Sequence, residues 1–152
     1  MTKQQYTDLG KMVQELTDKP VKVLLFPCNQ FLNQEPKMPT KESLKKMSTQ
    51  QLLDESDKHV ILMEKVEVNG KKASPVFEFL KYNSSLYQEA KHLVTPIPWN
   101  FSKFLVDQKG HVFKYYAPTV KMADVQSDIQ GLLSESDSHK AMPSRAPTKT
   151  LD

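Results

Sequence analysis

The chain has 152 residues and a nearly balanced charge, with 21 Lys and Arg against 18 Asp and Glu. This length predicts one domain with a single core. The net charge of +3 excludes the strongly basic composition typical of nucleic-acid binding. No apolar run approaches the ~20 residues that a membrane span needs. The single cysteine excludes an internal disulfide and is typical of a reducing, cytoplasmic compartment, and the four histidines lack the spacing of metal ligands.

The N-terminal part of the chain predicts a helix followed by a strand. Apolar side chains recur at helical spacing at Tyr6, Leu9, Val13 and Leu16. This helix is expected to end before Pro20. The continuous apolar run at residues 21–25 then predicts a short strand that is covered on both faces.

The middle of the chain predicts two further helices and one strand. Residues 40–52 carry a helical apolar pattern after Thr40, and residues 59–68 predict a strand or extended segment. Ser74-Pro75 is typical of a helix start. The predicted buried face of that helix is Val76, Phe77, Phe79 and Leu80. Residues 83–98 show no periodicity and predict an irregular loop.

The C-terminal third predicts a β-hairpin and a last helix. Residues 104–107 and 111–116 read as the two strands around a turn at 108–110. A helical stripe follows at Met122, Val125, Ile129 and Leu132. Residues 134–152 have almost no large apolar side chains and predict a disordered tail, which leaves residues 1–133 as the folded domain.

A polar loop, Phe26–Pro36 (FPCNQFLNQEP), comes directly after the first predicted strand. It brings one thiol and four amides, Cys28, Asn29, Gln30, Asn33 and Gln34. Ligands collect at the carboxyl ends of strands in α/β sheets, and amide groups donate hydrogen bonds to anions without carrying charge. The residues alone leave a second interpretation open, because amides after a strand are commonly loop formers and a lone cysteine is commonly an inert buried thiol.

Two strings of this sequence resemble the signatures of the glutathione peroxidase family. One is FPCNQF followed by NQEP, and the other is Trp99–Asp107 (WNFSKFLVD). The resemblance covers residues 2 to about 133. It implies an α/β, thioredoxin-like fold of the glutathione peroxidase type without its first strand, which lies between the strands at 21–27 and 103–107. It also implies a thiol-dependent peroxidase that reduces hydrogen peroxide or organic and lipid hydroperoxides, with glutathione or another thiol as co-substrate, no other cofactor and no metal.

The same resemblance implies the catalytic residues. In the family, the anion of a cysteine or selenocysteine attacks the peroxide O–O bond, and a Gln, a Trp and an Asn donate hydrogen bonds to that anion. These residues match Gln34, Trp99 and Asn100. Indole and amide N–H groups suit this role. Without the family context, Trp99 would be interpreted as a core aromatic residue and Asn100 as a turn cap.

The reactive residue itself is expected outside this sequence. The family pattern runs from the nucleophile through Gly, any residue, Thr, three residues and Tyr, and Met1–Tyr6 matches it from the third position. The nucleophile is therefore expected two positions before Met1, as a cysteine or as a selenocysteine whose UGA codon is read as a stop. An in-frame TGA two codons before the ATG would support the selenocysteine. Cys28 is expected to react slowly as a substitute.

The sequence departs from the family pattern at three positions. Leu25 and Leu32 stand where the family commonly has Ala or Gly, and Tyr115 stands where it tends to have Arg. The loss of the Arg leaves Lys114 as the nearest cation for the carboxylates of glutathione, with Lys103 and Lys109 as further candidates.

The assembly, the reductant and the alternatives to an enzyme also follow from these patterns. Residues 83–98 do not show the long loop of tetrameric members, so a monomer is predicted. Residues 37–53 contain no cysteine that could resolve an oxidised nucleophile, which favours glutathione over thioredoxin as reductant. The alternatives are a non-catalytic binding or redox-sensing module with a thioredoxin fold, and an inert fragment.

Overall fold

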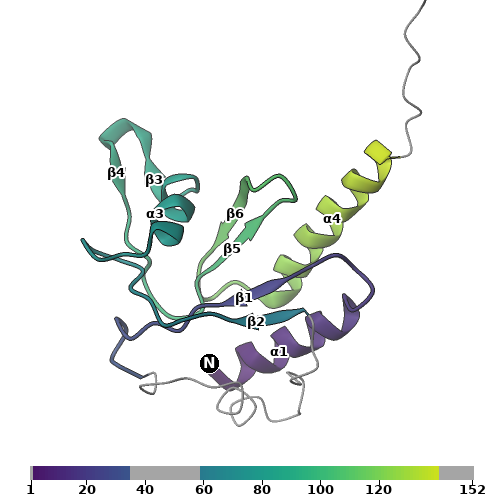
Figure 1. The fold of residues 1–152 in the computed structure, drawn as a ribbon, viewed down its shortest axis with the longest axis horizontal. Coiled ribbons are helices and arrows are strands. Elements are labelled where there is room, and N and C mark those ends of the chain that lie inside the picture. Colours follow the sequence, from purple (N-terminus) through teal and green to yellow (C-terminus); the bar gives the residue numbers. More distant parts are fainter. Residues whose placement is uncertain (1, 35–58, 141–152) are drawn as a thin grey trace, which may run out of the picture.

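The computed structural model describes residues 2–34 and 59–140. In chain order its elements are α1 (Thr2–Glu15), β1 (Val23–Leu25), β2 (Val60–Leu62), α3 (Pro75–Tyr82), β3 (Tyr87–Gln88), the 3-10 helix η1 (Glu89–Lys91), β4 (Leu93–Val94), β5 (Lys103–Val106), β6 (Val112–Tyr116) and α4 (Met122–Lys140) (Figure 1). The helix predicted at residues 40–52 lies outside the described residues. None of the described helices is long and apolar enough to cross a membrane.

The strands form three pairs. β1 runs parallel to β2, while β3–β4 and β5–β6 are antiparallel. In residues 2–34 and 59–140, neither β1 nor β5 has a strand on its second edge. This is the arrangement expected when the strand that lies between them in the thioredoxin-like fold is not part of the sheet.

The first core joins the β1–β2 pair to the β5–β6 pair through α1 and α4. All four residues of the predicted α1 stripe are buried, as are Met12 of the same helix and Tyr116 of β6, and they form one cluster with Met122, Val125 and Ile129 of α4. Partly buried side chains of β1, β2 and β5 pack against this cluster, among them Val23, Val60 and Leu105. The helical patterns at both ends of the chain are therefore confirmed, and the two helices hold β1–β2 and β5–β6 together.

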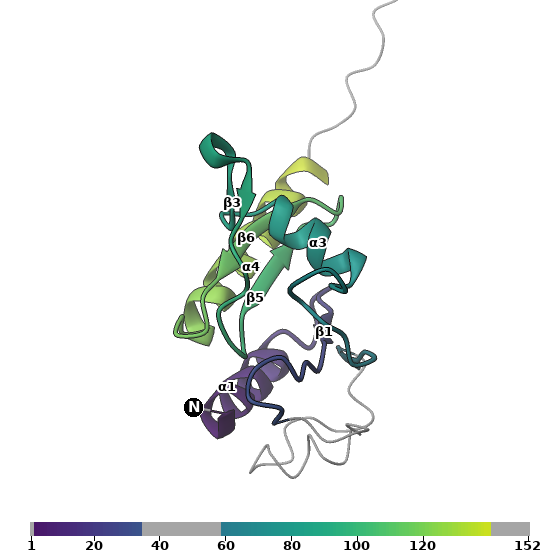
Figure 2. The ribbon, with the colours of Figure 1, turned by 90° about the vertical axis from the view of Figure 1, so that its left-hand side faces the viewer.

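The second core lies on the other face of the β5–β6 hairpin. Figures 1 and 2 show α3 and α4 on opposite sides of this hairpin. Phe77 of α3 packs edge-on against Phe26, with ring centroids 5.2 Å apart, and against Phe104 of β5 at 6.3 Å. The buried members of this core are Cys28, Phe31, Val68, Phe77, Leu86 and Ile97. The cluster therefore gathers the loop after β1, the segment after β2, α3 and the segment before Trp99.

The predicted buried face of α3 was only partly right. Phe77 is buried, but Val76 and Phe79 are 46% and 48% exposed, and the second buried residue of the helix is Lys81. Residues four apart lie on one side of a helix, so the inward stripe runs through Phe77 and Lys81. Ser74 precedes the helix as predicted but makes no side-chain capping hydrogen bond.

The prediction that the first strand is covered on both faces was wrong. Leu24 of β1 is 49% exposed and its partner Ile61 of β2 is 42% exposed. Successive side chains of a strand point to opposite faces, and α1 and α4 cover only one of them. The continuous apolar run therefore marked a strand correctly but overstated its burial.

Two further segments differ from their predictions. The segment 83–98, predicted as a loop, contains the short β3–β4 hairpin and η1. Helix α4 continues to Lys140, beyond the predicted domain end at residue 133. The rest of the predicted tail, residues 141–152, lies outside the described residues.

Candidate anion-binding site

The first loop of the candidate site leaves β1 and turns back at Leu32 and Asn33. Both residues adopt positive φ, 61° and 51°. The Asn33 N–H donates to the carbonyl of Asn29 at 3.2 Å, which closes the turn. Phe31 anchors the loop in the second core, whereas Gln34 is exposed. The turn therefore places Gln34 at the surface, three residues after the buried Phe31.

The backbone at Leu32 is predicted to store removable strain. A left-handed conformation costs an L-residue roughly 1–2 kcal/mol, while glycine adopts it freely. The Leu32 side chain is 74% exposed, so its removal forfeits little packing. We expect Leu32→Gly to raise the free energy of unfolding by up to about 1 kcal/mol in urea denaturation, since the greater freedom of glycine in the unfolded chain offsets part of the gain.

A matched control separates strain from side-chain loss. Leu93 is also exposed, at 58%, but it is not among the described residues with positive φ. Leu93→Gly should therefore destabilise the protein. A loss of stability in Leu32→Gly as large as that in Leu93→Gly would contradict the strain at Leu32.

The second loop carries Trp99 and Asn100 directly before β5. Trp99 is 37% exposed, and its ring packs against Phe31 with centroids 5.7 Å apart. Phe101 has a positive φ of 63°, and the Ser102 hydroxyl donates to the carbonyl of Trp99 at 3.0 Å. Trp99 is thus a partly exposed side chain and not a core aromatic residue. In the described ranges no hydrogen bond of the Asn100 side chain is found that would cap the turn.

The structure brings the two loops into contact but does not join the three predicted donors directly. Trp99 touches Phe31, which stands three positions before Gln34. Among residues 2–34 and 59–140, no hydrogen bond is found from the side chains of Gln34, Trp99 and Asn100. Of the three, only Trp99 lies at the contact between the loops, and the role of the three side chains as donors to an anion stays a prediction.

Comparisons with known proteins identify the family of this chain. The family profile described as "Glutathione peroxidase" matches residues 1–81. A "Probable phospholipid hydroperoxide glutathione peroxidase" of Mesembryanthemum crystallinum is 36% identical over 137 residues, which are 90% of this chain and 74% of that protein. The protein of the same description in Solanum lycopersicum is 36% identical over 133 residues, 88% of this chain and 72% of that protein. The chain belongs to the glutathione peroxidase family.

Solved structures confirm the fold that this family implies. The crystal structure of T. cruzi GPX1 matches with a TM-score of 0.59 and 26% identity, over 88% of this chain and 73% of that one. A second crystal structure, "Trgpx in apo form", matches with a TM-score of 0.58 over 86% and 71% of the two chains. The α/β, thioredoxin-like fold is therefore shown for this member of the family.

The cysteine in the FPCNQF signature is engaged inside the protein. Cys28 is 8% exposed. Its sulfur accepts a hydrogen bond from the Gln30 N–H at 3.5 Å, and its thiol donates to Gln30 Oε1 at 3.7 Å. Within the described ranges, no group of three or more His, Cys, Asp or Glu side chains could hold a metal ion.

Two of the three predicted cations, Lys103 and Lys114, are held in different places. Lys103 donates from Nζ to the carbonyl of Phe101 at 2.8 Å, one residue past Asn100, and burial lowers its pKa below the ordinary value for lysine. Lys114 instead forms an ion pair with Asp128 of α4 at 2.8 Å. Of these two lysines, Lys103 is therefore the candidate to add positive charge to the site.

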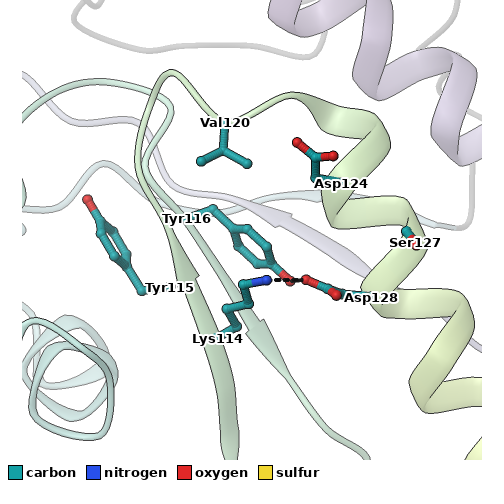
Figure 3. Close-up of a pocket in the computed structure, with 7 residues that line it drawn as sticks. All are labelled: Lys114, Tyr115, Tyr116, Val120, Asp124, Ser127 and Asp128. Atoms are coloured by element: carbon teal, nitrogen blue, oxygen red, sulfur yellow. Dashed lines mark hydrogen bonds and ion pairs between the residues drawn. The ribbon is translucent and has the colours of Figure 1, made fainter.

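Figure 3 shows the pocket between β6 and α4 in which Lys114 is held. The Tyr116 hydroxyl also donates to Asp128 Oδ2, at 2.8 Å, so the carboxylate ties β6 to α4. Tyr115 points to the other side, where its ring packs on Phe104 at 5.1 Å. This tyrosine, which stands where the family tends to have Arg, thus supports the second core.

Asp128 is predicted to make stability depend on pH in the acid range. Hydrogen bonds from Lys114 and Tyr116 lower the pKa of Asp128, although burial opposes them. Since the folded pKa lies below the unfolded value of ~3.9, this contribution is present above that pH and is lost as the pH falls through the folded pKa. We expect Asp128→Asn to flatten the acid limb, which is the decrease of the free energy of unfolding at low pH. The limb is measured as the midpoint of urea denaturation at a series of pH values.

A second carboxylate, Asp107, also contributes to the acid limb. Asp124 is the control for Asp128. The pKa of Asp107 is also lowered, first by the hydrogen bond from the His111 backbone, so part of the acid limb should persist in Asp128→Asn. Asp124 lines the same pocket. The Lys114 and Tyr116 side chains donate to Asp128 and not to Asp124, so Asp124→Asn should flatten the limb less than Asp128→Asn does. Equal flattening in both variants would contradict a specific role for Asp128.

Three polar residues join the loops; only Gln30 was predicted near the site, as a member of the amide cluster, and none of the three was predicted as catalytic. Gln30 bonds to the backbone of Val68 and Asn69, Asn69 bonds to the backbone of Ile97, and Lys81 bonds to the carbonyl of Val68. The sequence indicated only a turn at Asn69-Gly70 and an amide cluster around Gln30. Lys81 lies one helical turn after Phe77, which was the only local sign of its burial.

Proposed function

We propose that this protein is a thiol-dependent peroxidase that reduces hydrogen peroxide or organic and lipid hydroperoxides. Gln34, Trp99 and Asn100 are the catalytic residues of the proposal, because they would donate hydrogen bonds to a reactive thiolate or selenolate. The observation that carries this assignment is the contact between Phe31 and Trp99, which joins the loops bearing three uncommitted donors. The descriptions of the plant relatives as phospholipid hydroperoxide glutathione peroxidases support the substrate class.

The proposed reaction moves two electrons from thiols to the peroxide. The anion attacks one peroxide oxygen, so a bond from sulfur or selenium to oxygen forms while the O–O bond breaks. The leaving oxygen takes a proton and departs as water or an alcohol. One thiol then displaces the oxygen of the oxidised residue as water, and a second thiol releases the nucleophile and forms a disulfide.

The family pattern places the nucleophile two positions before the residue that matches Met1. Cys28 is not proposed as its substitute, because the thiol is buried and bonded to Gln30. Glutathione is the proposed reductant, with Lys103 as a cation for one of its carboxylates. A monomer without other cofactors, acting in the cytoplasm, completes the proposal, although related proteins include mitochondrial and chloroplastic members.

A peroxidase assay with two chains tests this function. One chain begins at Met1, and the other is extended at the N-terminus through a cysteine two positions before Met1 and the family's first strand. With glutathione and a recycling reductase, only the extended chain should turn over hydroperoxide. Turnover by the chain from Met1 that disappears in Cys28→Ser would contradict the assignment. Inactivity of both chains would favour the non-catalytic binding module.

A further inference from the structure

The segment that follows β2 is held in place by a side chain instead of by a neighbouring strand. Its Val66 N–H donates to the carbonyl of Pro27 at 3.0 Å. Beyond Val66, the side-chain amide of Gln30 makes the hydrogen bonds to the segment. Gln30 Oε1 accepts from the N–H groups of Val68 at 2.7 Å and of Asn69 at 2.9 Å, and its Nε2 donates to the Asn69 carbonyl at 2.9 Å. One glutamine therefore satisfies three backbone groups of the segment.

Lys81 holds the same segment from α3. Its Nζ donates to the Val68 carbonyl at 2.6 Å, and the side chain is only 7% exposed. Burial lowers the pKa of Lys81, an effect that Glu78 partly opposes. Val68 is itself buried, at 4% exposure. The segment is thus fixed from both sides before it reaches Asn69.

The Asn69 side chain then reaches the second loop. Its Nδ2 donates to the Ile97 carbonyl and its Oδ1 accepts from the Ile97 N–H, both at 2.9 Å. These two bonds reproduce one rung of a strand ladder with an amide side chain. Gly70 follows with φ of 80°, a conformation that lets the chain turn away directly after Asn69.

We propose that Gln30 and Asn69 form an amide clamp that sets the position of Trp99 and Asn100 relative to Gln34. Gln30 stands four residues before Gln34, and Ile97 stands two residues before Trp99. The clamp therefore spans the gap between the two loops by side-chain hydrogen bonds. Asn69 is a positioning residue, and its effect on catalysis rests on the proposed peroxidase function. Its effect on Trp99 does not depend on that function.

Fluorescence tests the clamp without an activity assay, because Trp99 is the only tryptophan of the chain. In Asn69→Ala we expect a red shift of the emission and stronger quenching by acrylamide, at unchanged far-ultraviolet circular dichroism. Asn83→Ala is the matched control, since Asn83 also donates one amide hydrogen bond, to the Phe79 carbonyl at 2.9 Å, outside the clamp. Parent-like emission in folded Asn69→Ala, or an equal shift in Asn83→Ala, would overturn the proposal.

A second variant keeps the test open if Asn69→Ala does not fold. Asn69→Asp retains an acceptor for the Ile97 N–H but places a carboxylate oxygen against the Ile97 carbonyl. Protonation restores a donor, so the emission should return toward that of the parent as the pH falls through the carboxyl pKa, which the facing carbonyl raises above its ordinary ~3.9. A pH-independent emission in Asn69→Asp would overturn the clamp.

Kinetics separates the clamp from the proposed function. In the extended, peroxidase-active chain, Asn69→Ala should lower the second-order rate constant for hydroperoxide and leave that for the thiol close to the parent value. If the extended chain is inactive while Asn69→Ala shifts the Trp99 emission, the clamp stands and the peroxidase proposal fails. If the extended chain is active and neither the emission nor the rate constant changes, the clamp fails alone.

Discussion

Removing a donor from Gln34, Trp99 or Asn100 is expected to lower the second-order rate constant for hydroperoxide by ~10²–10³-fold, by analogy with the loss of one oxyanion-hole donor. The informative substitutions are Gln34→Ala, Trp99→Phe and Asn100→Ala in the extended chain. Trp99→Phe keeps an aromatic ring against Phe31 while it removes the indole N–H. The measurement is the initial rate of glutathione-dependent peroxide consumption.

Matched controls show whether such losses are specific. Gln88 donates its amide to the Thr95 hydroxyl at 2.9 Å on the β3–β4 hairpin, so Gln88→Ala controls for Gln34→Ala. Asn83→Ala is the control for Asn100→Ala. Both controls should retain parent rates. Parent-like rates in all three donor variants would remove these residues from the catalytic site.

Leu16→Ala is expected to cost about 2–5 kcal/mol of unfolding free energy, the usual range for a buried leucine. Leu16 is 3% exposed and lies in the cluster of α1 and α4 that joins β1–β2 to β5–β6. A cavity there weakens the contact that holds both sheets, which makes it one of the most damaging single truncations in the described core. Urea denaturation measures the loss.

Leu24→Ala is the control for this truncation. Leu24 is the same residue type but 49% exposed, on the face of β1 that α1 and α4 leave uncovered. Its replacement should cost well below 2 kcal/mol because little packing is lost. Equal losses in the two variants would show that α1 and α4 are not the main support of the sheets.

Local patterns predicted correctly those elements whose buried side chains recur at one regular spacing along the sequence. The stripe from Tyr6 to Leu16 marks α1 because every member faces the same cluster. The hairpin at β5–β6 was confirmed because a turn separates two short β-rich runs. The inward face of α3 was misplaced, since a lysine occupies a position that apolar periodicity assigns to solvent, and only its bond to Val68 accounts for its burial.

The candidate site depended on contacts that local patterns do not encode. The bonds from Gln30 to Asn69 and from Asn69 to Ile97 join residues 39 and 28 positions apart. Asn69-Gly70 predicted a turn, and nothing in the sequence indicated where the Asn69 amide would bind. Gln34, Trp99 and Asn100 were predicted from the family motifs, and their role as donors stays a prediction until their effect on a reactive anion is measured.

The most direct test of that role is the pKa of the nucleophilic thiol in the extended chain. With Cys28→Ser as background, the ultraviolet absorbance of the thiolate reports a single group. If the three donors hold the anion, the pKa lies below the ~8.5 of a free cysteine and rises when Trp99→Phe and Asn100→Ala are combined. A pKa that these substitutions leave unchanged would contradict the anion-binding site.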